Sequence, residues 1–339
     1  MQKILVVRND KIGDFMLAWP SFAMLKQSMP QIELTVLVPS YTEKLAKLCP
    51  WIDKVIIDSK TKEGYKALVS QLKNERFSAA IALFSNTYNA KLLWKAKIPY
   101  RLAPATKLAQ IFYNHRLRQH RSLSLKPEYE YNLDLIREFL HAHRISIVEP
   151  KPPYLCFAEK QVTAQKEKLT QALFLSTYKK WCFVHTGTGG SANNLCLAQY
   201  AQLIHALFEA EPQFVFILTA GPGEAPQAMA LQKLIADVPS VLYDKNAGID
   251  DFSLSIACAD IFIAGSTGPL HIAAAIDIPT IGFFPSKRSA TPLRWQPLNS
   301  KGNHLAFSPP SHRETQDDLS VIDMNQVMEK VRPWLVSHL

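Results

Sequence analysis

The first residues that could do chemistry lie near the N-terminus, where Arg8 to Asp14 read RNDKIGD. They follow the apolar run 3–8 and precede a helical pattern that Pro30 ends. Gly13 permits a tight turn, and a carboxylate at Asp14, at the start of a helix, could accept a proton from an attacking hydroxyl group. Aspartate is also a favoured N-cap residue, so Asp14 could instead cap the helix. If capping were its only role, Asp14→Asn would barely change stability, whereas loss of a general base costs about 10²–10⁴ in rate.

A second group is a turn rich in glycine and threonine that follows the strand candidate Trp181–His185. Small residues let backbone N–H groups approach an anion closely, and hydroxyl groups add donors. The turn is neither a GxGxxG motif nor a P-loop, because no Gly-Lys-Ser/Thr follows it. We interpret it as a phosphate cradle, with a ligand-free flexible turn as the alternative. The residues expected to contact the phosphate are Thr186, Gly187, Thr188 and Gly189.

A third group, Ala264 to His271 (AGSTGPLH), again joins a strand to a helix. Pro269 suits the first turn of a helix, because the N–H that proline lacks would have no partner there. The N–H groups of Ser266, Thr267 and Gly268 and the positive end of the helix would form a seat for an anion. His271 lies in the first turn and could face the ligand, or it could be a satisfied histidine of the core.

The fourth group, Ala220 to Glu224 (AGPGE), follows the strand candidate Phe214–Thr219. An acidic residue after a strand of such a domain often accepts hydrogen bonds from ribose hydroxyl groups. Glu224 could equally be an acid at a helix start, where it favours the positive end of the helix dipole.

The elements that must position these groups are apolar strands alternating with helices, which is typical of parallel βαβ units. The proline-rich run 150–153 indicates a linker. We predict two Rossmann-like, doubly wound α/β domains at 1–155 and 156–320, facing across a cleft, and a C-terminal helix in 321–339 that packs back on the first domain. The strand candidates are Lys3–Arg8, Glu33–Val38, Lys54–Ile57, Ala79–Leu83, Trp181–His185, Phe214–Thr219, Val241–Tyr243, Ile261–Ala264 and Thr280–Phe284.

Charge is unevenly spread along the 339 residues, whose formal net charge is +9. The segment 77–127 contains no Asp or Glu, so part of the first domain must carry a positive field. Such a field gathers nucleic acid, an acidic membrane surface or a phosphorylated substrate, or it is simply a solvated face. The basic residues in it are Lys91, Lys95, Lys97, Arg101, Lys107, His115, Arg116, Arg118, His120, Arg121 and Lys126.

The same composition argues against several other classes of protein. The five cysteines are scattered without a CxxC pair, so we expect buried free thiols and no zinc site. No apolar run approaches the roughly 18 residues of a membrane span, and the N-terminus lacks a signal peptide, so we expect a cytoplasmic protein. Residues 108–117 are a candidate amphipathic segment for peripheral contact with the inner membrane surface; an ordinary packed helix or loop is the commoner alternative.

Taken in order and spacing, these groups resemble the ADP-heptose:lipopolysaccharide heptosyltransferases of glycosyltransferase family 9. The resemblance covers nearly the whole chain, and the IGD and STGPxH motifs together are its most specific part. The segments that carry it are ILVVRNDKIGDFMLAWPSFAMLK, ELTVLVPSYTEKLAKLCPWIDKVI, IALFSNTYNAKLLWKAKIPYRL, PEYEYNLDLIREF, FVHTGTGG, TAGPGE and AGSTGPLHIAAAIDIPTIGFF.

The resemblance implies a GT-B architecture and an inverting transfer from a nucleotide-activated heptose, with no metal cofactor. The first domain would receive an anionic glycolipid built on Kdo and lipid A, and the second would bind the donor, ADP-heptose. Asp14 matches the family's proposed catalytic base. The donor residues are Thr186, Gly187, Thr188, Gly189, Glu224, Ser266, Thr267, Gly268 and His271, and the acceptor residues are Lys11, Gly13, Arg116, Arg118 and Arg121.

The chain departs from the family pattern at two positions. Ser266 replaces an Asp found in many members, and Asn193 stands where many members have a Lys that contacts the donor diphosphate. We expect Lys287 or Arg288 to supply the missing charge. The departure keeps two alternatives open: a family member with another nucleotide sugar or acceptor, and a non-catalytic nucleotide-sugar-binding protein. A Rossmann dehydrogenase is disfavoured because the first turn lacks GxGxxG, and no nucleic-acid-reading motif accompanies the basic segment.

Overall fold

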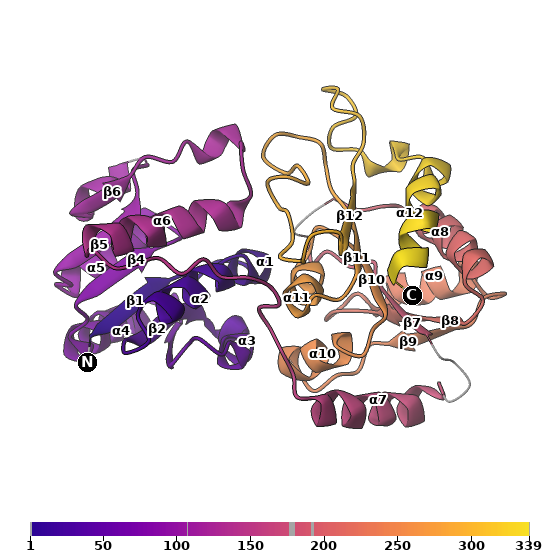
Figure 1. Ribbon diagram of the computed structural model, residues 1–339, viewed down its shortest axis with the longest axis horizontal. Helices are drawn as coiled ribbons and strands as arrows, with labels where there is room; N and C mark the ends of the chain where they lie inside the picture. The colour runs from indigo at the N-terminus through magenta and orange to yellow at the C-terminus, as the bar shows by residue number, and fades with distance from the viewer. Residues whose placement is uncertain (1, 107, 176–179, 191–192, 339) are drawn as a thin grey trace. The chain divides into compact units, whose positions relative to one another are not determined.

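The chain folds into two compact units, residues 1–154 and 155–339, each built on a six-stranded sheet (Figure 1). The computed structural model describes residues 2–106, 108–175, 180–190 and 193–338. The division falls within one residue of the predicted boundary at 155 and after the proline-rich run.

The first unit has strand order β3-β2-β1-β4-β5-β6. The pairings are all parallel, with β1 between β2 and β4, so the predicted doubly wound arrangement is confirmed. The strands are β1 (Lys3–Val7), β2 (Glu33–Pro39), β3 (Lys54–Asp58), β4 (Ala79–Ala82), β5 (Tyr100–Pro104) and β6 (His115–Leu117). The helices are α1 (Ile12–Met16), α2 (Trp19–Ser28), α3 (Glu43–Leu48), α4 (Lys62–Glu75), α5 (Thr87–Lys95) and α6 (Glu128–Ala142), with 3₁₀ turns η1 (Ser40–Thr42), η2 (Leu108–Phe112) and η3 (Arg121–Leu123).

Local sequence explains where the helices on either side of β4 begin. The Thr61 side chain accepts a hydrogen bond from Gly64 N and caps α4, and Asn86 does the same for Asn89 N at the start of α5. The segment 108–117, expected as an amphipathic helix or a packed loop, is instead the short η2 turn followed by β6.

The second unit has strand order β12-β11-β10-β7-β8-β9, again parallel throughout. Its strands are β7 (Lys180–His185), β8 (Phe214–Thr219), β9 (Ser240–Tyr243), β10 (Ile261–Gly265), β11 (Thr280–Phe283) and β12 (His304–Phe307). Its helices are α7 (Glu159–Leu173), α8 (Leu197–Ala210), α9 (Ala225–Leu234), α10 (Ile249–Ile256), α11 (Gly268–Ile276) and α12 (Met324–His338), with the 3₁₀ turn η4 (Leu319–Val321).

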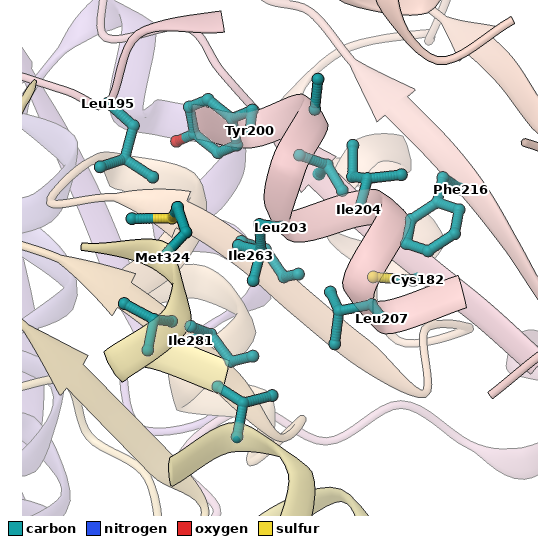
Figure 2. Packing of buried hydrophobic residues seen from close by; sticks show 14 of the residues in the cluster. Cys182, Leu195, Tyr200, Leu203, Ile204, Leu207, Phe216, Ile263, Ile281 and Met324 are labelled. Carbon is teal, nitrogen blue, oxygen red and sulfur yellow. The ribbon is translucent and has the colours of Figure 1, made fainter. Parts of the chain in front are cut away.

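The core of the second unit lies between its sheet and the helices α8 and α12 (Figure 2). Leu203 and Leu207 of α8 are fully buried beside strand residues such as Ile263, and burying each such side chain stabilises the fold by roughly 1.5–3 kcal/mol. The C-terminal segment, expected to pack back on the first domain, forms α12, which lies along α8, and Val331 of α12 joins this core.

Candidate functional site

In both sheets the strand order reverses at one point, which is where such sheets bind ligands at the carboxyl ends of their strands. In the first sheet this point lies between β1 and β4. In the second it lies between β7 and β10, and β8 is the next neighbour of β7. The second, third and fourth sequence groups follow β7, β10 and β8, so parallel pairing brings these three loops to one edge of the sheet.

Asp14 is the third residue of α1, whose N-cap residue is Lys11. The interpretation of Asp14 as an N-cap is therefore wrong. Its carboxylate, part-exposed at 19%, instead forms an ion pair with Arg8, with Nη2 2.6 Å from Oδ1. Because Asp14 is not a cap, we no longer expect Asp14→Asn to leave stability unchanged. Removing the carboxylate charge leaves the buried guanidinium of Arg8 with one charged partner fewer.

Arg8 directly follows β1 and is almost completely buried, at 2% exposure. Its Nη1 donates to Leu83 O at 3.1 Å, which ties the end of β1 to the end of β4. Its Nε lies 3.0 Å from Asp10 Oδ1, and its Nη1 lies 3.9 Å from Glu128 Oε1. Burial lowers the pKa of Arg8, but the three carboxylates outweigh it and hold the pKa above its ordinary value. The guanidinium thus orients the Asp14 carboxylate.

Asp10 and Glu128 extend this charge network on either side of Arg8. Burial raises the pKa of Asp10 to about 7; Arg8 opposes the shift and Asp14 adds to it. Glu128 accepts from Arg121 Nη1 at 2.6 Å, so Arg121, expected at the acceptor, is tied into the same network. Sequence pattern alone assigns no role to Arg8, Asp10 or Glu128. A charged residue at the end of an apolar strand was the available signal.

The other predicted acceptor residues occupy different places. Lys11 is exposed at the start of α1, and Gly13 lies inside that helix rather than in a tight turn. Arg116 and Arg118 are exposed on and just beyond β6, at the sheet edge. Because β6 is three strands from β1, the spacing of parallel strands separates them by about 14 Å. The structure therefore does not place these two arginines beside Asp14.

A buried amide pair anchors the loop between β1 and α1, the helix that carries Asp14. Asn9 Nδ2 donates to Asp58 Oδ2 at 2.6 Å and to Asn89 Oδ1 at 2.9 Å. Asn89 Nδ2 donates back to Asn9 Oδ1 at 2.8 Å. These bonds join the ends of β1 and β3 to the first turn of α5, and the three side chains lie within 2% exposure. Sequence reasoning missed this network because its members are 49 and 80 residues apart.

In the second unit, Glu224 joins the loop after β7 to the loop after β8. Its Oε1 accepts from Gly189 N at 2.7 Å and its Oε2 from Gly221 N at 2.9 Å. A Cβ on Gly187 would lie 1.9 Å from Glu224 Oε2, so position 187 must be glycine for this approach. The Glu224 carboxylate thus organises the glycine-rich turn after β7 and the loop after β8.

His185, to which sequence pattern assigns no role, lies next to Glu224. It is 4% exposed, with Nδ1 2.9 Å from Thr219 Oγ1 and Nε2 3.6 Å from Glu224 Oε2. Burial lowers its pKa, while Glu224 acts in the opposite direction. The neutral ring therefore packs under the cradle.

Thr186 and Thr188 of the cradle are held by their own loop and its neighbours. Asn194 Nδ2 donates to Thr186 O at 2.8 Å, and Thr188 Oγ1 accepts from Gly190 N at 3.2 Å. A Cβ on Gly265 would lie 2.6 Å from Asn194 Oδ1, so Asn194 packs closely against the end of β10.

Asn193, the position of the missing lysine, contacts the loop before η4. Its Nδ2 donates to Asp317 O at 2.7 Å, and Lys287 Nζ lies 3.1 Å from Asp317 Oδ2. Lys287, one of the two residues expected to replace the missing lysine, is therefore held by Asp317, which Asn193 also contacts. Arg288 is exposed beside it.

The third loop leaves two buried polar atoms at the start of α11. Ser266 N donates to Phe283 O at 3.0 Å, so this amide is already used within the sheet. Thr267 is the N-cap residue of α11, followed by Gly268 and by Pro269 in the first turn as expected. Among the described residues, neither Thr267 Oγ1 nor His271 Nδ1 has a hydrogen-bond partner. Such atoms are rare in folded proteins, and a ligand would account for them.

His271 is 2% exposed, and burial lowers its pKa to about 4. His271 is therefore a neutral histidine of the core, but its Nδ1 has no hydrogen-bond partner among the described residues.

Two properties of the described residues bear on cofactors and membranes. Across the described ranges, no three His, Cys, Asp or Glu side chains cluster so as to hold a metal ion. In the same ranges, no helix has the length and apolar content to cross a bilayer. All five cysteines are free; Cys49, Cys182 and Cys258 are buried as expected, while Cys156 and Cys196 are exposed.

Comparisons with known proteins agree with this arrangement. The model of glycosyltransferase family 9 (heptosyltransferase) matches residues 65–321. A Haemophilus influenzae relative whose name calls it a glycosyltransferase is 56% identical over 333 residues, covering 98% of this chain and 96% of its own. A family 9 glycosyl transferase structure from Veillonella parvula has a TM-score of 0.81 at 14% identity, covering 99% of this chain and 97% of its own. The structure of E. coli ADP-heptose lps heptosyltransferase II has a TM-score of 0.78 at 17% identity and covers 99% of both chains.

Proposed function

The chain belongs to glycosyltransferase family 9, the heptosyltransferase family, with its two-domain GT-B fold, and we propose that it transfers heptose from ADP-heptose to an anionic lipopolysaccharide inner-core acceptor. The acceptor we propose is of the Kdo–lipid A type. The observation that carries the proposal is the meeting of three loops, after β7, β8 and β10, at one edge of the second sheet. The name of the E. coli neighbour, which includes ADP-heptose and lps, supports this choice of substrates.

The donor binds the second unit in this proposal. Its diphosphate meets the glycine-rich turn 186–190 and the N-terminus of α11, where N–H groups point outward and the helix dipole is positive. Glu224 exchanges at least one of its backbone partners for the ribose hydroxyl groups. Thr267 Oγ1 and His271 Nδ1 gain the partners that they lack within the described chain.

The acceptor hydroxyl group loses its proton to Asp14. The carboxylate is part-exposed and is held by Arg8, which is itself fixed by Leu83 O and two further carboxylates. The proton moves to Asp14 as the C–O bond forms on the face of the anomeric carbon opposite the diphosphate, so the configuration inverts. ADP departs with its growing negative charge stabilised by preoriented N–H groups, and no metal takes part in this scheme.

A second candidate is a transferase of the same family with a different nucleotide sugar or acceptor. Asn193 favours it, because this side chain contacts Asp317 where many family members place a lysine on the donor diphosphate. A protein that binds the donor without turnover would show affinity for ADP-heptose and no product, whereas a changed donor would show affinity for another nucleotide sugar.

The donor site can be tested with Thr267→Val, which removes the hydroxyl group and keeps the shape of the side chain. If Thr267 Oγ1 bonds the donor, calorimetry should show ADP-heptose affinity falling by about tenfold, because the ligand group is left unpaired. The matched control is Thr35→Val in β2, whose Oγ1 is likewise buried without a partner among the described residues. Equal donor affinity in both variants would remove Thr267 from the donor site.

A further inference from the structure

An exposed tyrosine lies beside the loop that leads to Asp14. Tyr41 belongs to η1, which directly follows β2, and β2 pairs in parallel with β1. The loops after these two strands are therefore neighbours at the carboxyl edge of the first sheet. The Tyr41 side chain is 55% exposed. A single exposed apolar side chain needs no explanation by itself, so the contacts of this one decide whether it has a role.

The hydroxyl group of Tyr41 holds the ring in place. It donates to Asp10 O at 2.6 Å, in the loop that precedes α1 and Asp14. Burial raises the pKa of this hydroxyl group, and the negative charges of Asp10 and Asp14 raise it further, so the group lies near both carboxylates. Over half of the side chain nevertheless remains open to solvent. A ring that is already held loses little conformational freedom when a ligand packs on it, which favours a binding role.

The charges around this ring suit a sugar that carries an acidic group. Lys11, which follows Asp10 in the chain, is exposed. Glu43, two residues after Tyr41, is paired with Lys47, with Nζ 2.6 Å from Oε1, so the carboxylate charge is balanced. The C–H face of a sugar ring can pack on an aromatic side chain, and a carboxylate or phosphate on the same sugar can pair with a lysine. An aromatic ring and an exposed lysine on adjacent loops therefore match both properties of such a ligand.

We propose that Tyr41 is a specificity-determining residue whose ring packs on the sugar that carries the accepting hydroxyl group, while Lys11 pairs with an acidic group of that sugar. The inference rests on the proposed transfer reaction and names the part of the acceptor that the first unit recognises. The hydrogen bond to Asp10 O orients the ring, and the ring itself makes the contact. A sugar held there lies beside Asp14, which takes the proton of its hydroxyl group.

The test measures acceptor binding in the absence of donor and separates the Tyr41 ring from its hydroxyl group. The probe is the glycan of Kdo–lipid A with its acyl chains removed, and calorimetry with the full chain gives the Kd. Tyr41→Leu should weaken binding by about tenfold, because the aromatic contact is lost. Tyr41→Phe keeps the ring and should bind within about threefold of wild type. The affinity for ADP-heptose should be unchanged in both variants, since the donor binds the second unit.

The matched control is Trp94→Leu, which removes an aromatic ring of similar exposure, 52%, near the end of α5 in the same unit. This variant should bind the glycan as wild type does. Equal binding by wild type and Tyr41→Leu would overturn the proposal. So would a loss in Tyr41→Phe as large as that in Tyr41→Leu, because the hydroxyl group and not the ring would then be responsible. Wild type that does not bind the glycan at all would overturn the proposed acceptor, and this inference with it.

Discussion

Asp10→Asn tests the charge network around Arg8 through the pH dependence of stability. Asp10 is buried, with its Oδ1 3.0 Å from Arg8 Nε and without a hydrogen-bond partner in the described chain. Burial raises the pKa of this carboxyl to about 7 in the folded protein, and the charges facing it are those of Arg8, Asp14 and Glu128. In the unfolded chain the pKa returns to about 3.9.

The sign of the effect follows from proton uptake on folding. Between about pH 4 and pH 7 the folded protein holds a proton on Asp10 that the unfolded chain has lost, so the free energy of unfolding falls as the pH rises through this window. Each pH unit is worth about 1.4 kcal/mol, which makes the total decline at most roughly 4 kcal/mol. Asparagine imitates the neutral carboxyl at every pH and removes this decline.

We therefore expect Asp10→Asn to have nearly wild-type stability at about pH 4.5 and to become relatively more stable than wild type at about pH 8. Denaturant unfolding followed through backbone protection in β1 gives the free energy for the first unit. Asp53→Asn, at an exposed carboxylate of the same unit that pairs with Lys26, serves as the control and should leave the wild-type pH dependence in place. A constant difference for Asp10→Asn as well, or a loss of stability that grows toward pH 8, would refute the reasoning.

Two further predictions concern the donor cradle of the second unit and the buried amide network of the first unit. Gly187→Ala places a Cβ 1.9 Å from Glu224 Oε2, so the carboxylate must move away from the cradle. Calorimetry should show the affinity for ADP-heptose falling by about tenfold or more, while the melting temperature changes little. Undiminished affinity would disprove the role of Glu224. Asn89→Ala removes a partner of Asn9 and leaves the buried Asn9 amide with fewer hydrogen bonds. The free energy of unfolding of the first unit should fall by about 1–3 kcal/mol in chemical denaturation. The control is Asn86→Ala, which removes the cap of the same helix; an equal or smaller loss for Asn89→Ala would show that the network contributes nothing beyond capping.

Much of this arrangement could be predicted because it depends on local pattern and on a general rule of topology. Apolar runs located most of the strands, and parallel pairing then required the loops after β7, β8 and β10 to share an edge. Strands β5, β6 and β12 were missed because they are short and only partly buried, so they give little periodic signal.

The contacts that tie Arg8 to Leu83 and Glu128 could not be read from the sequence because they join residues far apart in the chain. Glu128 reaches Arg8 only through the packing of α6 on α2, and nothing in the local pattern of either residue reports that packing. The error at Asp14 has a different cause, because it concerns the helix boundary. Helix α1 begins at Ile12 with Lys11 as its N-cap residue, so Asp14 lies in the first turn and pairs with Arg8.

The most direct test of the account measures acceptor-dependent ADP release from ADP-heptose, with a Kdo–lipid A acceptor, for wild type and Asp14→Asn. Wild type should release ADP only when the acceptor is present, and Asp14→Asn should be slower by about 10²–10⁴ while still folded and still binding donor. Asp53→Asn, at an exposed carboxylate paired with Lys26, should keep the wild-type rate. Wild-type turnover by a folded Asp14→Asn protein would contradict the assignment of the base, and donor binding without any release by wild type would contradict the proposed transfer.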